Sequence, residues 1–137
     1  MQTGKIVQVM GPVVDVAFDT TPLPEIKTAL KVDNHGRECV MEVAQQMGQS
    51  VVRCIMLSAS EGLERDMVVT NTGAGITVPV GEKTLGRLFN VLGDAIDGQP
   101  APETEEHWEI HRKPPKFEDQ NPVQEVLETG IKVIDLL

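Results

Sequence analysis

The sequence IVQVMGPVVDVAF occupies residues 6–18 of the chain. Its two runs, Ile6 to Met10 and Val13 to Phe18, are rich in Val and Ile, which are favoured in β-strands. Gly11 and Pro12 separate the runs, and such a pair ends strands and forms turns. The stretch therefore predicts two short strands joined by a tight turn.

Strand-like runs continue at intervals through the first 80 residues. Turns are expected at Asn34-His35-Gly36, where Gly36 can adopt positive φ, at Met47 to Gln49, and in the proline-rich stretch Thr20 to Pro24. This spacing predicts a small all-β barrel or sandwich, and we favour a barrel because closure removes exposed strand edges. The further strands expected are Thr28 to Asp33, Arg37 to Ala44 (with Cys39, Met41 and Val43 on one face), Val51 to Leu57, Met67 to Thr70 and Ile76 to Val80.

The pattern changes after Pro79, where apolar residues recur at helical spacing. Thr84 is a suitable N-cap and Gly93 a suitable end for a helix. Turns are expected over residues 94–102, and a polar, irregular segment over 103–115. The helix is predicted from four residues at i, i+3, i+4 and i+7, which are Leu85, Leu88, Phe89 and Leu92.

A second helix is expected from Asn121, with Pro122 at its first position and Gln124 three residues after the cap. The end of the chain, Ile131 to Leu137, is apolar and has no sheet of its own to cover. We therefore interpret residues 1–80 as a barrel domain and residues 81–137 as the opening of a second, helical or α/β domain. The alternative is a helical appendix that folds back on the barrel.

Composition excludes several classes of function. The 137 residues include 12 Lys and Arg but 21 Asp and Glu, for a net charge of −9. A nucleic acid or an anionic membrane needs a basic face, so neither is the expected partner. Cys39 and Cys54 are too few for a disulfide scaffold and are expected to be reduced packing residues, with a disulfide as the minority alternative. No signal peptide or membrane-spanning run is present, so we expect a soluble, intracellular chain.

Two glycine-containing motifs come close to known phosphate-binding patterns. Gly81 to Leu88 nearly fits G-x-x-x-x-G-K-[ST], but Arg87 and Leu88 replace the Lys and the hydroxyl residue that carry the chemistry. We expect a packing helix there rather than a phosphate site. Asn71 to Gly75 contains Gly-x-Gly but opens no helix, so a hairpin loop is expected.

Titratable residues give no local active-site pattern. His107 and His111 share a helical face if the segment is helical and could then bind a metal, but a solvated connection is favoured because H-E-x-x-H is absent and Pro114 follows. Asp15 and Glu42 could do acid–base work if the fold brought them together, but exposure on the outer barrel face is the preferred interpretation.

A set of longer stretches carries a resemblance to a known family. The most specific block is Val78 to Gly81 followed by Thr84 to Arg87 and Asn90 to Gly93. With the others, it resembles the beta subunit of the F-type ATP synthase over the whole chain, more closely than the paralogous alpha subunit. The other blocks are Gly4 to Val16, Val52 to Ile55, Glu61 to Leu63, Ile110 to Arg112 and Glu128 to Leu137.

The resemblance implies a six-stranded β-barrel over residues 1–80. Residues 81–137 would then be the mostly helical or irregular start of an α/β nucleotide-binding domain, cut before the phosphate loop. The parent subunit makes or hydrolyses ATP coupled to proton transport and binds ATP or ADP with Mg²⁺. The residues that do so have no counterparts here, so we expect no catalytic, cofactor-binding or metal-binding residue in this chain, and no ATPase activity from it alone.

The resemblance also implies a role in assembly, since alternating alpha and beta barrels form a ring at one end of the catalytic hexamer. The implied partners are alpha subunits and other F1 subunits, with no nucleic acid and no direct membrane insertion. The implied location is a peripheral complex on the cytoplasmic side of a bacterial cell membrane. Segments 4–18 and 51–57 are candidates for the barrel core and the ring contacts. The alternative is a self-standing barrel module for oligomerisation or binding, which would bury Ile131 to Leu137 where a fragment leaves them exposed.

Overall fold

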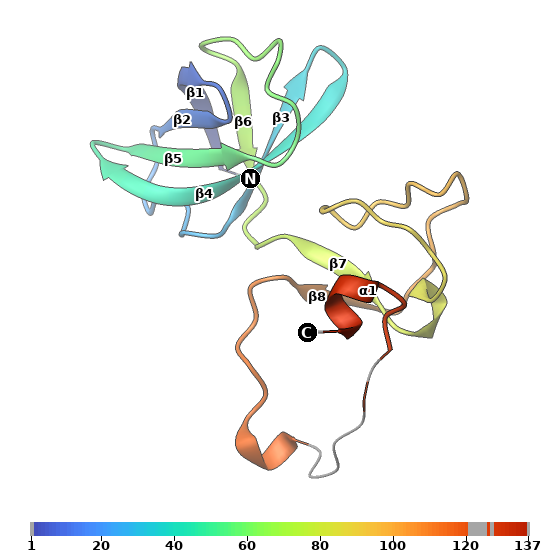
Figure 1. Cartoon of the computed structure of the whole chain (residues 1–137). Coiled ribbons are helices and arrows are strands. Elements are labelled where there is room, and N and C mark those ends of the chain that lie inside the picture. Colours follow the sequence, from blue (N-terminus) through green and yellow to red (C-terminus); the bar gives the residue numbers. More distant parts are fainter. Residues whose placement is uncertain (1, 121–125, 127, 137) are drawn as a thin grey trace.

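A computed structural model of the chain describes residues 2–120, 126 and 128–136. Six antiparallel strands close into a barrel in the order β1-β2-β5-β4-β3-β6, which confirms the predicted six-stranded barrel (Figure 1). The barrel strands are β1 (Thr3–Met10), β2 (Val13–Phe18), β3 (Ala29–Asn34), β4 (Arg37–Gly48), β5 (Val51–Met56) and β6 (Val68–Asn71). The remaining elements are β7 (Thr77–Val80), the 3-10 helix η1 (Glu82–Thr84), β8 (Glu106–Glu109), the 3-10 helix η2 (Phe117–Asp119) and α1 (Lys132–Asp135).

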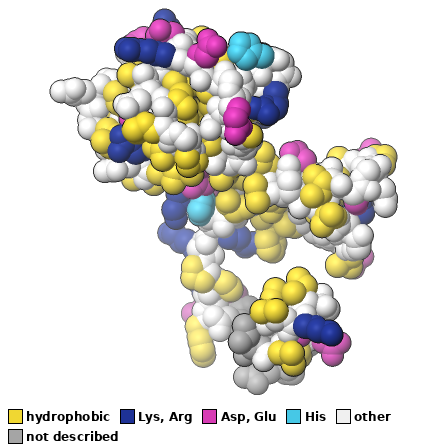
Figure 2. All heavy atoms as spheres, turned by 45° about the horizontal axis from the view of Figure 1, so that its top comes forward, with side chains coloured by type: hydrophobic (Ala, Val, Ile, Leu, Met, Phe, Trp, Pro, Cys, Tyr) yellow, Lys and Arg dark blue, Asp and Glu magenta, His cyan; other side chains and the backbone are white. Residues whose placement is uncertain are grey.

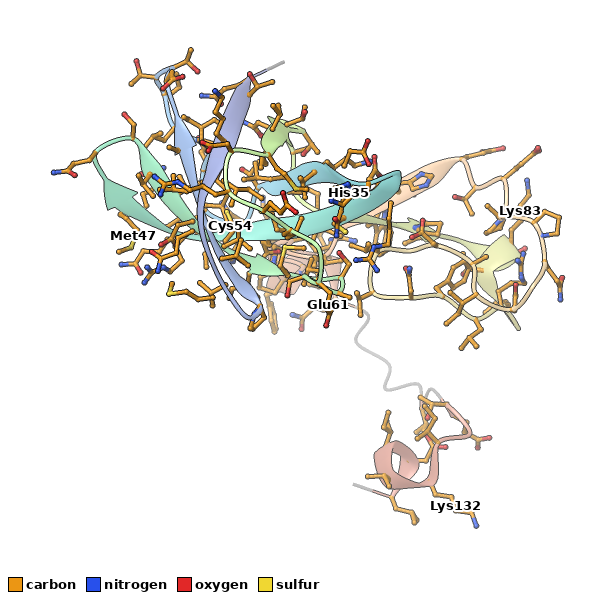
Figure 3. All side chains as sticks on the ribbon, turned by 90° about the horizontal axis from the view of Figure 1, so that it is seen from above. His35, Met47, Cys54, Glu61, Lys83 and Lys132 are labelled. Atoms are coloured by element: carbon orange, nitrogen blue, oxygen red, sulfur yellow. The ribbon has the colours of Figure 1, made fainter. Side chains whose placement is uncertain are left out.

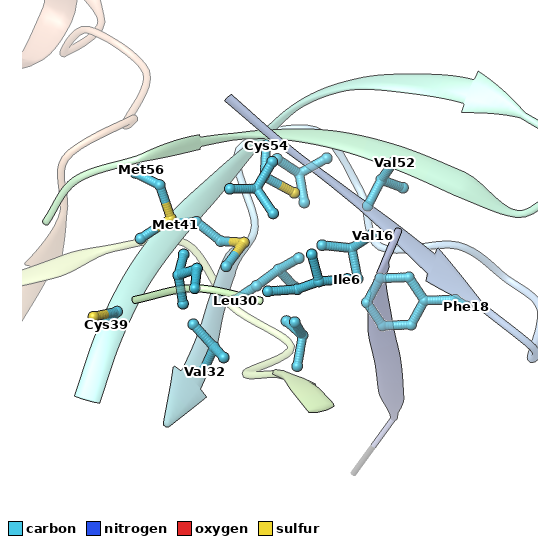
Figure 4. Packing of buried hydrophobic residues seen from close by; sticks show 14 residues of the cluster. Ile6, Val16, Phe18, Leu30, Val32, Cys39, Met41, Val52, Cys54 and Met56 are labelled. Atoms are coloured by element: carbon cyan, nitrogen blue, oxygen red, sulfur yellow. The ribbon is translucent and has the colours of Figure 1, made fainter. Parts of the chain in front are cut away.

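The barrel interior is filled by every second side chain of its strands, because successive residues of a strand point to opposite faces. Cys39, Met41 and Val43 of β4, which were predicted to share one face of the strand, are all fully buried. Phe18 is also fully buried and closes one end of the core shown in Figure 4. Burial of one such large apolar side chain stabilises the fold by about 1.5–3 kcal/mol. The core residues, in chain order, are Ile6, Val14, Val16, Phe18, Leu30, Val32, Cys39, Met41, Val43, Val52, Cys54, Met56, Leu63 and Val69.

The β3–β4 turn has the geometry expected from its sequence. His35 and Gly36 both have positive φ, 54° and 87°, and the Gly36 N–H donates to the carboxylate of Asp33 at 2.7 Å. Two successive residues with positive φ match the twist of a two-residue hairpin. The predicted turn is confirmed, and Figure 3 shows His35 at this hairpin.

The strand expected as the last of the barrel run instead belongs to a second sheet. β7 pairs antiparallel with β8, which lies in the segment expected to be irregular. Where the chain leaves the barrel, Ile76 is buried on the outer face of the barrel against Ala29 and Val40. The loop over residues 71–75 therefore joins two sheets and is not the expected hairpin loop.

The predicted helix over residues 85–92 is wrong. Gly86 has φ of 71°, which an α-helix cannot contain, and Phe89 forms an isolated antiparallel bridge with Ala95. Leu85 and Leu88 are 78% and 58% exposed, so the helical spacing marks no buried face. The segment is a folded-back loop that follows η1, in which Thr84 is the last residue instead of the cap.

The C-terminal segment is only partly described. The start of the second predicted helix, at Asn121 to Gln124, lies outside the described residues. α1 is a single turn, and Figure 3 shows Lys132 on it. Ile131, Val133, Ile134 and Leu136 are all exposed. Within the described residues, no helix has the length and apolar character needed to span a membrane.

Candidate functional site

An ion pair fills the outer barrel face at Asp15. Asp15 of β2 lies opposite Arg53 of β5, whose Nε and Nη2 donate to the two carboxylate oxygens at 2.8 and 2.9 Å. Hydrogen bonding from Arg53 lowers the pKa of Asp15, although burial of the carboxyl acts in the opposite direction. Asp15 is only 7% exposed, so the expected exposed residue is in fact covered by its partner. A carboxylate held in this way is a structural anion and is not suited to proton transfer.

Glu42 has a different partner, which joins the two sheets. His111, just beyond β8, lies with its Nε2 2.7 Å from a carboxylate oxygen of Glu42 on β4. Beside it, the Ile110 N–H donates to the Ile76 carbonyl at 3.0 Å. The fold therefore does not bring Asp15 and Glu42 into one acid–base pair. Instead, Glu42 contacts His111 and so connects the segment after β8 to the barrel.

The two histidines do not form the metal-binding pair that a helix would allow. His107 lies on the strand β8 opposite Pro79, so the four-residue spacing to His111 does not bring the rings together as on a helix. In the ranges that the structure describes, no group of three His, Cys, Asp or Glu side chains could hold a metal ion. The favoured interpretation, a solvated connection, is wrong for His111, which contacts the barrel.

In the segment that resembles a phosphate loop, residues 81–88, both cationic side chains already donate hydrogen bonds within the chain. Arg87 donates through Nε and Nη2 to Asp97, and Nη2 also reaches the Pro100 carbonyl at 2.7 Å. Hydrogen bonding from Arg87 holds the pKa of Asp97 far below its usual range. Lys83, at the other end of the segment, donates to the Glu103 carbonyl at 2.8 Å. These contacts brace a surface loop and leave neither cation directed at a phosphate.

Both cysteines are free and fully buried, which confirms the prediction of reduced packing residues and excludes the disulfide alternative. Burial raises the pKa of the Cys54 thiol to about 12, and the negative charge of Asp15 acts in the same direction. The thiolate is the nucleophilic form of cysteine. Cys54 is therefore a packing residue and not a candidate nucleophile.

Apolar side chains that are exposed or half-buried form a row across three barrel strands, which we call the outer row. Met10 pairs with Val13, and Val13 pairs with Ile55. Direct cross-strand partners point to the same side of a sheet, so these three side chains are neighbours on the outer face. Met10 and Ile55 are 41% and 47% exposed. Figure 2 shows hydrophobic side chains reaching the surface of the barrel.

A second exposed apolar residue lies on the other side of the barrel. Val68 of β6 is 56% exposed. In the closed strand order, β6 is the strand opposite β5, which carries Ile55. Two distant sides of the barrel thus present apolar side chains. On the outer face of β3 and β4, in contrast, Ala29 and Val40 are buried against Ile76, with Leu92 packed against this cluster.

Sequence reasoning missed the outer row and the His111–Glu42 contact for different reasons. The row had a signal, because Met10 and Val13 flank the Gly11-Pro12 turn at equal distances and are therefore cross-strand partners. The His111–Glu42 contact has no such signal in the sequence, because it forms only where β7 leaves the barrel.

A comparison with known protein families shows which family the barrel is similar to. Residues 6–73 match the model described as "ATP synthase alpha/beta family, beta-barrel domain". The matched span begins within β1 and ends just beyond β6, so it contains nearly the whole closed barrel. The barrel of this chain is therefore similar to the beta-barrel domain of the ATP synthase alpha/beta family.

Proposed function

We propose that the chain is the N-terminal part of a beta subunit of an F-type ATP synthase, and that its barrel joins neighbouring subunits into a ring. The family of the barrel supports the general class of subunit. The choice of beta over alpha rests on sequence blocks that lie outside the matched span, above all Thr84 to Arg87, Asn90 to Gly93 and Glu128 to Leu137.

The observation that carries the assembly role is the distribution of exposed apolar residues around a closed barrel. A closed barrel has no free strand edge, so neighbours must associate through side chains on its outer face. A subunit in a ring needs two different faces, one for each neighbour. Ile55 on β5 and Val68 on β6, on opposite sides of the barrel, supply one apolar position for each.

The proposed partners are alpha subunits of the same complex, alternating with beta subunits, together with other F1 subunits. The proposed location is a peripheral complex on the cytoplasmic side of a bacterial membrane. ATP or ADP and Mg²⁺ belong to the parent subunit in this proposal. The occupied side chains of Arg87 and Lys83 support the expectation that residues 81–88 bind no nucleotide, so the chain alone is proposed to be inactive as an ATPase.

The test is association with a purified alpha subunit, measured by size-exclusion chromatography with light scattering. We expect a complex with the unchanged chain, and weaker association for Ile55→Lys and Val68→Lys. Glu38→Lys is the matched control, because it adds a lysine at an exposed position of β4 that belongs to neither proposed face. Association that all three variants leave unchanged would contradict the proposed faces. If the chain forms homo-oligomers and does not bind the alpha subunit, the alternative of a self-standing oligomerisation module would be favoured.

A further inference from the structure

β8 presents a strand edge that can accept another strand. We propose that this edge binds an extended, basic peptide segment of another polypeptide, which adds to the β7–β8 sheet by backbone pairing. The inference is independent of the proposed ring, because β7 and β8 lie outside the barrel.

The register shows which backbone groups point outward. The Ile110 N–H donates to the Ile76 carbonyl, which makes Ile76 and Ile110 a hydrogen-bonded pair. Hydrogen-bonded and non-hydrogen-bonded pairs alternate along an antiparallel ladder. Thr77–Glu109 and Pro79–His107 are therefore non-hydrogen-bonded pairs, whose N–H and C=O groups point away from the partner strand. His107 and Glu109 each present a donor and an acceptor at the outer edge of β8.

The opposite edge, that of β7, is less able to pair. Pro79 occupies an outward-pointing position there and has no N–H. It therefore cannot donate a backbone hydrogen bond to an added strand. Gly93 also lies against β7, since a Cβ on it would come within 2.7 Å of Pro79 Cδ and 3.2 Å of Val78 Cα. The two edges of the sheet are thus unequal, and β8 carries the one with its donors intact.

The edge of β8 is open in the part of the chain that the structure describes. All four residues of β8 are exposed, and the described residues form no hydrogen bond to the outward backbone groups of His107 and Glu109. Trp108, between them, is 48% exposed, with the Arg112 guanidinium 3.6 Å from its ring centroid. An incoming strand would cover these backbone groups and part of the indole.

Charge indicates what kind of strand fits. Side chains alternate along β8, so Glu106 shares one face with Trp108, and Glu109 shares the other with His107. A carboxylate therefore flanks the edge on each face, with Glu105 next in the chain. A second copy of β8 would place carboxylates against carboxylates, which is unfavourable across strands. Lys or Arg at alternate positions of an incoming strand would lie on one face and complement the carboxylate of that face, with apolar side chains on the other.

Binding can be followed through Trp108, because it is the only tryptophan of the chain. The probe is the peptide acetyl-VKVKVK-amide, added to the full chain while tryptophan fluorescence and amide hydrogen exchange are measured. We expect a fluorescence change and protection of the His107 and Glu109 amides, but not of Thr77. A fully N-methylated peptide keeps the charges without the donors, and acetyl-VEVEVE-amide keeps the donors with reversed charge. Each should bind at least about tenfold more weakly.

Two proline variants locate the edge on the protein. His107→Pro removes an outward donor from β8 and should weaken binding, whereas Thr77→Pro removes the equivalent donor from β7 and should not. If His107→Pro disturbs the sheet, the N-methylated peptide still decides the question on the unchanged chain. Equal binding of the N-methylated peptide, protection at Thr77, or no binding at millimolar peptide would overturn the proposal. Protection of His107 that rises with chain concentration alone would also overturn it, in favour of self-pairing.

Discussion

Gly4 lies directly against the ring of Phe18. A Cβ on Gly4 would lie 3.0 Å from Cδ1 and Cε1 of Phe18 and 2.6 Å from the Ala17 carbonyl oxygen. The absence of a side chain on β1 thus allows β2 to approach with its largest core residue. The backbone oxygen is the harder constraint, because a ring can turn but the ladder between β1 and β2 fixes the carbonyl.

Gly4→Ala is therefore expected to destabilise the barrel. Forcing an extra methyl group into a packed core typically costs about 1–3 kcal/mol. Urea unfolding followed by circular dichroism gives the change in the free energy of unfolding. Thr3→Ala, at an exposed position of the same strand, serves as the control. If the two variants have the same midpoint, the packing of Gly4 on Phe18 contributes nothing to stability.

Asp15 and Arg53 make the stability of the barrel depend on acid pH. Because the pKa of Asp15 is lowered in the folded state, its contribution is present above the unfolded pKa, near 3.8, and is lost as pH falls through the folded value. Asp15→Asn should lower the urea midpoint at pH 7, and the difference from the unchanged chain should shrink towards pH 2. Glu38→Gln, which breaks the more exposed ion pair with Lys31, should have a smaller effect at pH 7. A difference for Asp15→Asn that is constant from pH 2 to 7 would exclude the charge as its cause.

The Cys54 thiol should react only slowly with thiol reagents in the native chain. Its thiol is fully buried and its pKa is raised to about 12 by burial, so almost no thiolate is present or accessible at pH 8. A colorimetric thiol reagent should react slowly with the folded chain and rapidly with both cysteines in denaturant. Cys39→Ser isolates the signal of Cys54. Fast reaction of the native variant would show that the barrel opens more readily than its packing indicates.

His111 and Glu42 hold the β7–β8 sheet against the barrel through a contact that is only partly exposed. His111→Ala should reduce the hydrogen-exchange protection of the Ile110 amide roughly two- to fivefold, corresponding to a bond worth about 0.5–1 kcal/mol. His107→Ala is the matched control, on the same segment but without a barrel contact among the described residues. Equal loss of protection in both variants would mean that the strand, and not the His111–Glu42 contact, sets the stability of this junction.

The barrel was predictable because its signals are local. Alternation along residues 37–44 placed Cys39, Met41 and Val43 on one face, and the turn at His35 and Gly36 followed from residue type. The segment after the barrel was not predictable in the same way. Its apolar spacing from Leu85 favoured a helix, but one glycine at positive φ, at Gly86, and the hydrogen bonds of Arg87 to Asp97 impose a loop instead.

Long-range partners account for the other differences. Asp15 is an ordinary exposed strand residue until β5 places Arg53 opposite it. Glu42 and His111 are far apart in sequence, and only the departure of β7 from the barrel brings them together. The strand β8 carries a carboxylate on each face and Trp108 as its one large apolar residue, so its sequence lacks the alternation by which strands are identified. In each case the missing information is the identity of a neighbour and not a property of the residue itself.

The closure of the barrel has a consequence for the newly made chain. Thr3 pairs with Thr70 and Lys5 with Val68, so the first strand of the barrel to be synthesised finds its second neighbour only when the last barrel strand has emerged from the ribosome. Until then β1 has one unpaired edge, and the apolar core is not yet covered by β6. Such non-local pairing is slow to form and leaves hydrophobic surface uncovered during synthesis. A pause in translation before residue 71 would therefore leave an incomplete barrel open to chaperones or to aggregation.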